Sequence, residues 1–420
     1  MLYFFIQLFL FIITPISLIA EENNSQPIKS PHADPFYDNF ESESDPIKGV
    51  SQILEFAESE KQGILQWNPL DPLKKRWDNL NQFLQKKYRL ELGTAYTTLY
   101  QKASEGITHD EAAGGDFDLF GICIVASDLK LGFATEIRSR YTEIPPNLLG
   151  PAIGSLWKTT STFSNYSYKL IRLWIDYQLI RDRLRFIAGK IDLTDYVYLY
   201  RFSSPNFNFI GQGMTSGLTI PIPSNGLTFL AEYKPTKDTA VIAQVADANG
   251  DKRTLSFDTF FNKHEYFSSI EFMYTPNLPS WGKGNYNLVF WYIDPRKDFL
   301  TRSSYGIAFT LEQECTEGIV PFLRYGYTNG KATTVQQFVT TGIGFLAPFS
   351  RKDDEYGIGY TWGHPSNGTL REQFSIETYY RLQLTHHIQI TPDIQIYINP
   401  SNNPGENVIG VFSIRGRIDI

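Results

Sequence analysis

The sequence predicts an all-β fold, a transmembrane antiparallel β-barrel of sixteen strands with a short N-terminal helical segment. From Tyr88 to Ile420, apolar and polar residues alternate with a period of two through numerous segments of about ten residues. Tyr and Trp gather near the ends of the apolar faces, whereas the opposite faces hold Gly, Ser, Thr and isolated charges, which suit a wet lumen. Aromatic residues make up 15% of the chain and charged residues 20%, which is rich in rings and low in charge for a soluble protein.

The first twenty residues, "MLYFFIQLFLFIITPISLIA", form an uncharged apolar run that predicts a signal peptide over residues 1–20. The mature chain would then begin near Glu21, although the run lacks a leading Lys or Arg and Leu18 is not small. An uncleaved anchor is the alternative. No other stretch approaches the roughly 18 apolar residues of a membrane helix. A membrane protein without such helices must be a closed barrel, since only closure pairs every backbone group in lipid.

Between this run and the barrel, two further segments are expected. Residues 21–49 are polar, acidic and contain proline, which is typical of a flexible leader. Residues 50–87 predict a helical periplasmic segment, with a short pattern near Val50–Glu60 and a clearer one beginning at Asp71. In the second pattern, four apolar residues fall on one face of a helix, at Leu73, Trp77, Leu80 and Leu84. The simplest interpretation is a helix docked on the barrel base, and the barrel itself would occupy residues 88–420.

The number of strands follows from loop lengths. About seventeen candidate strands can be counted after Tyr88, but a bacterial barrel needs an even number. With the N-terminus in the periplasm, alternate connections should be short, as at Ser127–Asp128 and Arg181–Asp182. Ser224–Asn225–Gly226 is a hairpin signal and predicts a third periplasmic turn. The later short connections fall on the periplasmic side only if one candidate strand between Leu227 and Ile293 is removed. The chain then has sixteen strands and a periplasmic C-terminus.

Several other classes of function are disfavoured. The formal charge is −7 with no basic stripe, so no nucleic-acid partner is expected. Cys123 and Cys315 could pair or remain free. No metal-ligand spacing appears, and adjacent histidines at 386 and 387 point to opposite faces of a strand, so neither metal nor cofactor is expected. A secreted glycoside hydrolase would need paired carboxylates, for which Glu271 and Glu377 are candidates without a pairing signal, so no enzyme activity is expected.

A two-residue turn at Arg181–Asp182 predicts which side chains face the lumen. It aligns Gln178 with Arg185, and period two then keeps even positions of one strand beside odd positions of the next. The predicted lumen residues are Arg172, Trp174, Asp176, Arg183 and Arg185. Asp176 would lie within reach of Arg185 across the strands. The predicted lipid-facing residues are Ile171, Leu173, Ile175, Leu184 and Phe186, and Lys190 shares their parity, so it should lie at headgroup level or beyond the strand end.

The next segment, "IDLTDYVYLYRFSSPNFNFIGQGM" (191–214), is too long for a simple turn and too aromatic for a solvated loop. We expect it to fold back into the mouth and narrow the lumen, with Tyr198 and Arg201 beside the passing solute. The alternative is a loop that only packs on its neighbours.

The C-terminal stretch resembles the carbohydrate-selective porins of the OprB family. The resemblance rests on Glu377 and Tyr380, a Pro–Asp–x–Gln segment, an Asn–Pro turn at 399–400 and an Arg in the last strand. A Gly–Lys–x–Asp strand end and the helix leading into the first strand, "RWDNLNQFLQKKYRLELGTAYTTLY", are also similar. The residues that match the family motifs are Gly189, Lys190, Asp192, Pro392, Asp393 and Gln395, and the alternation of their strands places Glu377 and Arg415 on the lumen side. One departure is the final Ile420, where such barrels usually end in an aromatic residue.

The resemblance implies a pore for facilitated diffusion of carbohydrates, exported through the periplasm into the outer membrane of a Gram-negative bacterium. Its expected partners are small sugars and outer-membrane lipid, and a homo-oligomer is compatible with the size. A sugar-preferring pore would use Arg for hydrogen-bond donors and Tyr or Trp for flat stacking surfaces. A general or anion-selective diffusion porin on the same barrel is the alternative.

Overall fold

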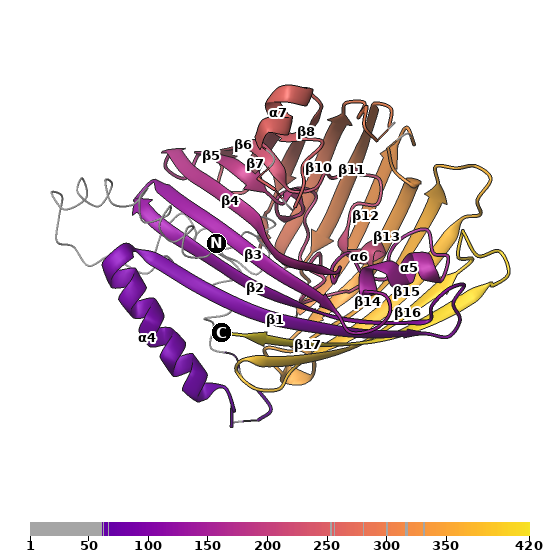
Figure 1. The fold of residues 1–420 in the computed structure, drawn as a ribbon, viewed down its shortest axis with the longest axis horizontal. Coiled ribbons are helices and arrows are strands. Elements are labelled where there is room, and N and C mark those ends of the chain that lie inside the picture. The colour runs from indigo at the N-terminus through magenta and orange to yellow at the C-terminus, as the bar shows by residue number, and fades with distance from the viewer. Residues whose placement is uncertain are drawn as a thin grey trace.

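The computed structural model describes residues 61–420 except 62, 66, 253, 256, 280, 300, 316, 317 and 331. Its strands form one antiparallel sheet that closes on itself (Figure 1), because β1 (Leu90–Ala103) pairs with both β2 (Glu111–Ala126) and β17 (Val408–Asp419). Of the seventeen strands in the sheet, β9 (Asn277–Leu278) pairs only with the start of β10, so sixteen strands form the wall. The predicted barrel and strand number are confirmed.

The other strands of the wall run in chain order around the barrel. They are β3 (Leu129–Arg140), β4 (Tyr166–Ile180), β5 (Leu184–Ile191), β6 (Gly226–Thr236), β7 (Thr239–Asp247), β8 (Tyr266–Tyr274), β10 (Gly282–Ile293), β11 (Ser304–Gln313), β12 (Ile319–Thr328), β13 (Val335–Leu346), β14 (Glu355–Pro365), β15 (Gln373–Gln383) and β16 (Ile388–Ile398).

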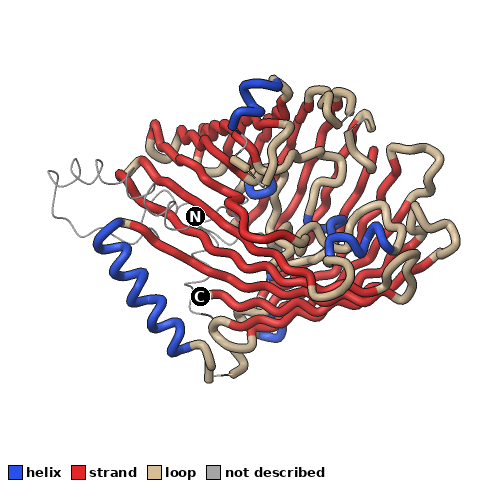
Figure 2. The backbone as a smooth tube through the Cα atoms, in the orientation of Figure 1, coloured by secondary structure: helices blue, strands red, loops and turns tan. Residues whose placement is uncertain are grey.

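The two ends of the barrel differ. The end we call the turn end carries the tight connections 127–128, 181–183 and 237–238, together with helix α4 (Asp71–Tyr88) and the last residue of the chain. The opposite end, the loop end, carries the long connections 141–165, 192–225 and 248–265. The short helices at the loop end belong to these connections (Figure 2). They are η2 (Pro146–Leu148), α5 (Leu149–Ala152), η3 (Leu193–Asp195), α6 (Gln212–Thr215) and α7 (Phe257–Lys263), while η5 (Pro348–Ser350) lies at the turn end.

Alternate residues of each strand face opposite environments, as the pleat requires. On β17, Phe412 and Ile414 are 48% and 40% exposed, whereas Ser413 and Arg415 are 0% and 1% exposed. The exposed set forms an apolar outer face of the kind a barrel presents to lipid. The inner set is polar and is buried by segments that enter the lumen. The predicted alternation is therefore confirmed.

The helix before the barrel spans Asp71–Tyr88, with a proline in its first turn. The side chain of Asn81 accepts a hydrogen bond from the backbone N–H of Leu92 at 3.1 Å and donates to its carbonyl at 2.7 Å. These bonds satisfy a stretch of β1 that β17 is too short to pair. The expectations for a signal peptide, a leader and a helical pattern near 50–60 lie outside the described residues. Among the described residues, no helix is both long enough and apolar enough to cross a bilayer.

The expected periplasmic hairpin at Ser224–Asn225–Gly226 is wrong. Gly226 pairs with Ile191, so Asn225 and Gly226 lie at the loop end, where the connection from β5 enters β6. Prolines at 221 and 223 explain why the preceding residues form no strand, since each removes a donor that a sheet ladder needs. Four wall strands lie between Leu227 and Ile293, and the total of sixteen agrees with the expected number.

The two cysteines, which the sequence could not assign, are both free in the structure. Cys123 is buried on β2 and its thiol donates to the carbonyl of Tyr88 at 3.6 Å. Cys315 follows β11, which is not a neighbour of β2 in the sheet.

Candidate functional site

The connection between β5 and β6, residues 192–225, folds into the barrel and fills part of the lumen (Figure 1). Tyr200, Phe202 and Phe209 from this connection are 0% exposed. Their rings pack edge-on or tilted against Phe322 of β12 and Tyr379 of β15, with centroids 4.7–5.9 Å apart. Ring pairs in such geometries stabilise a fold by more than the burial of their apolar area alone. We call this connection the inner loop.

A first polar clasp joins the inner loop to β12. The guanidinium of Arg324 donates to the carbonyl of Met214 at 2.5 Å and to the carbonyl of Tyr198 at 3.2 Å. It also lies 4.3 Å from the ring centre of Tyr198 and 4.4 Å from that of Tyr200. Arg324 is 0% exposed, so these carbonyls and rings replace the water molecules that would otherwise solvate its charge. Sequence analysis missed this residue, because one Arg among alternating residues looks like any lumen charge.

A second clasp lies on β15 and β17. The carboxylate of Glu377 accepts hydrogen bonds from the backbone N–H groups of Ile210 and Gly211, at 2.5 and 2.9 Å. Arg415 donates to the carbonyls of Pro205 and Asn208 at 2.6 and 2.9 Å. Both predicted lumen residues do face inward, but they are 3% and 1% exposed and bind the inner loop.

Two other predicted contacts also hold the inner loop. The hydroxyl of Tyr198 donates to the carbonyls of Phe309 and Tyr325 at 2.9 and 3.1 Å, and its backbone N–H donates to Glu271. Arg201 lies on the opposite side from β4, where its backbone N–H donates to Glu312 at 2.9 Å. Glu271 and Glu377, the carboxylates that a hydrolase would have had to use, thus both accept backbone hydrogen bonds from the inner loop.

The motif residues of β16 hold a second connection, residues 141–165. Gln395 donates to the carbonyl of Thr159 at 3.1 Å and to the carboxylate of Asp393 at 3.1 Å. Asp393 and Gln395 are both 1% exposed on the lumen side, whereas Pro392 is on the outward face of β16. This pair positions the β3–β4 connection against the barrel wall.

The predicted register between β4 and β5 is observed for most of its length. Gln178 faces Arg185, Asp176 faces Ile187 and Trp174 faces Gly189. Arg185 forms a two-bond ion pair with Asp176, at 2.8 and 2.7 Å, and all three predicted residues here, including Trp174, are buried on the lumen side.

Two details of that register are wrong. The turn has three residues, 181–183, and a register shift follows Gln178, so Arg183 is exposed in the turn rather than facing the lumen. Ile171 is 1% exposed rather than lipid-facing, because the pairing of Ala134 with Arg172 and of Thr135 with Leu170 makes Ile171 the extra residue of a bulge.

The start of the inner loop is tied to β4 by Arg172. Its guanidinium forms two hydrogen bonds with the carboxylate of Asp195, at 2.6 and 2.9 Å, and lies 4.0 Å from Asp192. Asp192 caps η3 by accepting from the backbone N–H of Thr194 at 3.1 Å. Although burial opposes the shift, Lys252, Arg172 and the bonds from Thr194 lower the pKa of Asp192 below its ordinary value.

The preceding motif residues mark the end of β5. Gly189 has a φ of 137°, a left-handed conformation that other residues rarely adopt. Lys190 donates to the carbonyls of Asp251 and Thr254 in the β7–β8 connection, the first at 2.6 Å. Lys190 lies one residue before the end of β5 and is 0% exposed, so it is within the strand and not beyond its end.

Across the lumen, strands β2 and β3 carry a charged cluster that sequence reasoning missed. Carboxylate oxygens of Asp116, Asp118 and Glu136 lie within 4.8 Å of one another. Arg138 lies 2.8 Å from Asp116 and 3.0 Å from Glu136, so it already supplies a counter-charge to this candidate cation site. Asp118 keeps partial exposure, and Tyr166 donates to Glu136. The spacing of Asp116 and Asp118, two residues apart in "GGDFDLF", was the available signal.

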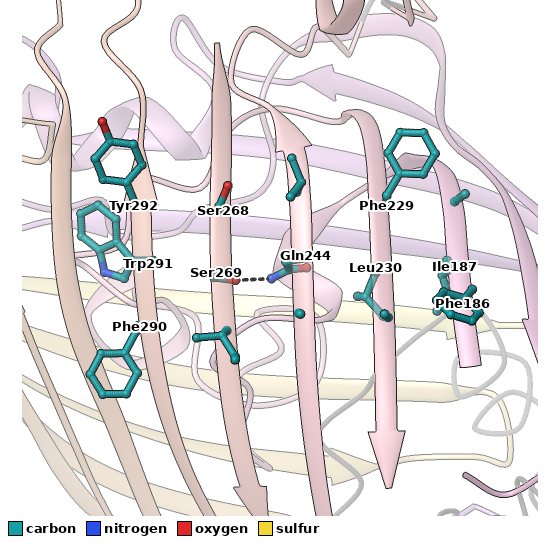
Figure 3. Close-up of a pocket in the computed structure, with 15 residues that line it drawn as sticks. Phe186, Ile187, Phe229, Leu230, Gln244, Ser268, Ser269, Phe290, Trp291 and Tyr292 are labelled. Carbon is teal, nitrogen blue, oxygen red and sulfur yellow. Dashed lines mark hydrogen bonds between the residues drawn. The ribbon is translucent and has the colours of Figure 1, made fainter. Parts of the chain in front are cut away.

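A shallow apolar groove crosses β5–β8 and β10 (Figure 3) but does not belong to the lumen. Phe186, Phe229 and Phe290 on its margin are 40%, 46% and 43% exposed and have the outward parity. Ala231 and Ala243, which face each other across β6 and β7, leave it shallowly hollowed. It is a feature of the outer wall.

These observations define a porin: a closed barrel of membrane type whose lumen is narrowed by a loop folded inward from one end. The chain belongs to the carbohydrate-selective porin, OprB family, whose model matches residues 116–418. It is therefore a protein of a Gram-negative outer membrane, and its fold and family are those of a channel rather than an enzyme.

Solved structures agree with this fold. The chain is similar to a high-pH structure of OprB from Pseudomonas putida, with a TM-score of 0.67 and 15% identity over 82% of this chain and 97% of that one. A low-pH structure of the same protein gives a TM-score of 0.55 and 14% identity, over 86% and 100% of the two chains.

Two curated relatives align with a smaller part of the chain. Porin AaxA of Chlamydia abortus is 20% identical over 49% of this chain and 47% of its own length, and porin AaxA of Chlamydia felis is 22% identical over 49% and 48%. The chain thus aligns with about half the length of the curated relatives it matches.

Proposed function

We propose that this member of the family passes small neutral sugars between the inner loop and the wall formed by β2, β3 and β4. The supporting observation is the one-sided docking of the central part of the inner loop, residues 198–216, whereas its two ends are tied to β4. Its hydrogen bonds from residues 198–216 to the wall run to strands between β8 and β17, through Glu271, Glu312, Arg324, Glu377 and Arg415. The wall of β2–β4 faces this loop with partly exposed Asp118 and Arg172.

The chemistry of this wall suits a neutral, hydroxyl-rich solute. A sugar needs donors and acceptors at fixed positions but no net charge in its surroundings. Arg138 pairs with Asp116 and Glu136, and Arg172 pairs with Asp195, so carboxylate acceptors and guanidinium donors alternate along the wall. A wall with both signs present does not favour anions, which argues against the anion-selective alternative.

We propose two different roles for the residues that the sequence singled out. Arg172, together with Asp118, would contact the solute, because both keep part of their surface exposed. Trp174, Asp176 and Arg185 would form the rigid wall behind them. A further set would fix the inner loop in place and so set the width of the passage: Tyr198, Arg201, Glu377 and Arg415. Asp393 and Gln395 would fix the β3–β4 connection in the same way.

A liposome-swelling assay tests the sugar preference. Purified protein in vesicles is exposed to mono- and disaccharides and to zwitterionic and anionic solutes of matched size. We expect monosaccharides to enter faster than size-matched charged solutes. Rates that follow solute size alone would instead assign a general diffusion porin.

For orientation, we propose that the loop end faces the exterior and the turn end the periplasm, with residues 1–20 directing export. Short connections, together with the last residue and the helix that leads into β1 at the same mouth, are typical of the periplasmic side of such barrels.

A further inference from the structure

The helix before the barrel carries an apolar flank that the described protein leaves uncovered. No side chain of α4 is buried. Leu73, Leu80 and Phe83 are 51%, 43% and 53% exposed, although they are the type of residue that a docked helix hides. Leu73 and Leu80 are seven residues apart and so lie on nearly the same side of the helix.

The barrel contacts a different side of the same helix. Asn81, which bonds to Leu92 of β1, lies about a quarter-turn around the axis from Leu80, since successive residues are rotated by about 100°. Lys75, Gln82 and Lys86 are exposed on the flank opposite Leu73 and Leu80. The helix therefore has its barrel contact between a polar flank and the flank of Leu73, Leu80 and Phe83. Arg76 and Lys87 also lie on this second flank, where the Lys87 ammonium is 5.5 Å from the centre of the Phe83 ring, so their long side chains can reach lipid headgroups.

The position of α4 matches this three-sided pattern. It runs along the rim of the turn end and crosses the direction of β1 steeply (Figure 1). A helix that crosses the strands at the rim of a membrane barrel lies closer to the membrane plane than the strands do. Its first turn is near the β15–β16 connection, where the backbone N–H of Leu65 donates to the carbonyl of Leu384 at 2.8 Å. Both of its ends are thus fixed to the barrel wall.

The charge of α4 identifies the surface that its apolar flank would meet. The helix carries five basic residues, Lys74, Lys75, Arg76, Lys86 and Lys87, against the acidic Asp71 and Asp78. The whole chain has a net charge of −7, so this local excess of positive charge is a departure from its surroundings. Amphipathic helices with basic polar faces bind anionic lipid by burying the apolar side at the headgroup boundary.

We propose that α4 is an interfacial helix, which docks its Leu73–Leu80–Phe83 flank into the anionic phospholipid leaflet at the turn end. The excess of basic residues on the same helix favours an anionic lipid surface. The docking would fix the height of the barrel in the bilayer and does not depend on which solute the pore passes.

Site-directed spin labelling tests this on the full protein. In a Cys123→Ser, Cys315→Ser background, Leu80→Cys carries the label on the apolar flank and Gln82→Cys carries the matched control on the polar flank. The protein is reconstituted in vesicles of phosphatidylethanolamine and phosphatidylglycerol, and assembly is checked by heat-dependent migration on gels. We expect the label at position 80 to be relaxed more by oxygen than by a water-soluble nickel chelate, and the label at 82 to show the reverse.

Two results would overturn the proposal. Equal access of the chelate to positions 80 and 82 would place the helix in water. Shielding of position 80 from both reagents would mean that protein, either a second copy or residues 1–60, covers the flank. The contribution of charge is tested by K75Q/K86Q/K87Q in the L80C background. We expect these changes to bring position 80 closer to water in phosphatidylglycerol vesicles, and an unchanged depth would remove the lysines from the proposal.

Discussion

The guanidinium of Arg324 lies 4.3 Å from the ring centre of Tyr198 and donates a hydrogen bond to the carbonyl of the same residue at 3.2 Å. One side chain of the wall therefore holds the inner loop by its backbone and by a ring. Arg324 thus acts together with Glu377 and Arg415 to keep the loop in the lumen, since the loop is joined to the barrel covalently only at the loop end.

Replacing Arg324 should widen the pore. Arg324→Met keeps the apolar stem but removes the bonds to Met214 and Tyr198, each of which is made by a charged donor and contributes about 1.5–3 kcal/mol. We expect a higher and noisier single-channel conductance in planar bilayers, and weaker block of the current by added sugar. Arg183→Met, in the exposed turn, is the control and should behave as wild type. An unaltered conductance in a correctly assembled Arg324→Met barrel would place the constriction elsewhere.

Asp118 should influence ion selectivity. Its carboxylate is partly exposed on the wall of β2, and a unit charge 4 Å from a passing ion contributes roughly 1 kcal/mol even in water. Asp118→Asn should therefore lower the cation-to-anion permeability ratio about fivefold, measured from reversal potentials in a salt gradient. Asp128→Asn, an exposed residue of the β2–β3 turn, should leave the ratio unchanged. If both variants shift the ratio equally, the effect is one of overall charge and not of the wall.

The orientation of the barrel can be checked with two cysteines. Gly368 lies in the β14–β15 connection at the loop end, and a side chain there would meet no atom within 4 Å. Lys237 lies in the tight β6–β7 turn at the opposite end. In a Cys123→Ser, Cys315→Ser background, an impermeant maleimide added to intact cells should label Gly368→Cys and spare Lys237→Cys. The reverse pattern would invert the topology.

Acid should lower the stability of the turn end by protonating Asp354. Its carboxylate accepts hydrogen bonds from the Tyr380 hydroxyl at 2.8 Å, the backbone of Gln383 at 3.0 Å and the guanidinium of Arg351 at 3.1 Å. Although burial opposes the shift, these bonds lower the pKa of Asp354 below its ordinary value of 3.8. A lowered pKa means that the group stabilises the fold above pH 3.8 and that this contribution is lost as the pH falls below that value.

The corresponding measurement compares Asp354→Asn with wild type in detergent. We expect a lower thermal unfolding temperature for the variant at neutral pH, and converging temperatures as the pH falls below the lowered pKa of Asp354, where the wild-type carboxylate is also protonated. Asp182→Asn serves as control, since Asp182 is exposed in a turn with a φ of 59° that Asn also tolerates. A constant difference between Asp354→Asn and wild type at every pH would mean that charge plays no part.

The sequence was sufficient for most features that depend on the period of two. Lipid on one side and a polar lumen on the other impose the alternation on each strand, so the barrel and the Asp176–Arg185 pair could be predicted from parity alone. Parity also placed Glu377 and Arg415 on the lumen side. The same rule failed at Ile171, because a bulge inserts one residue and reverses the faces locally.

Only the tertiary structure decided what those inward residues bind. Glu377 meets the backbone of Gly211, and Arg324 meets Met214, across separations of more than 100 residues along the chain. Parity places many charged groups in the lumen, and the sequence around each of them does not determine which ones the inner loop will contact. The hairpin signal at Asn225–Gly226 failed for the same reason. The sequence of a turn determines which backbone conformations are accessible, while the end of the barrel at which it lies depends on how the preceding residues, here interrupted by prolines, pack inside the closed sheet.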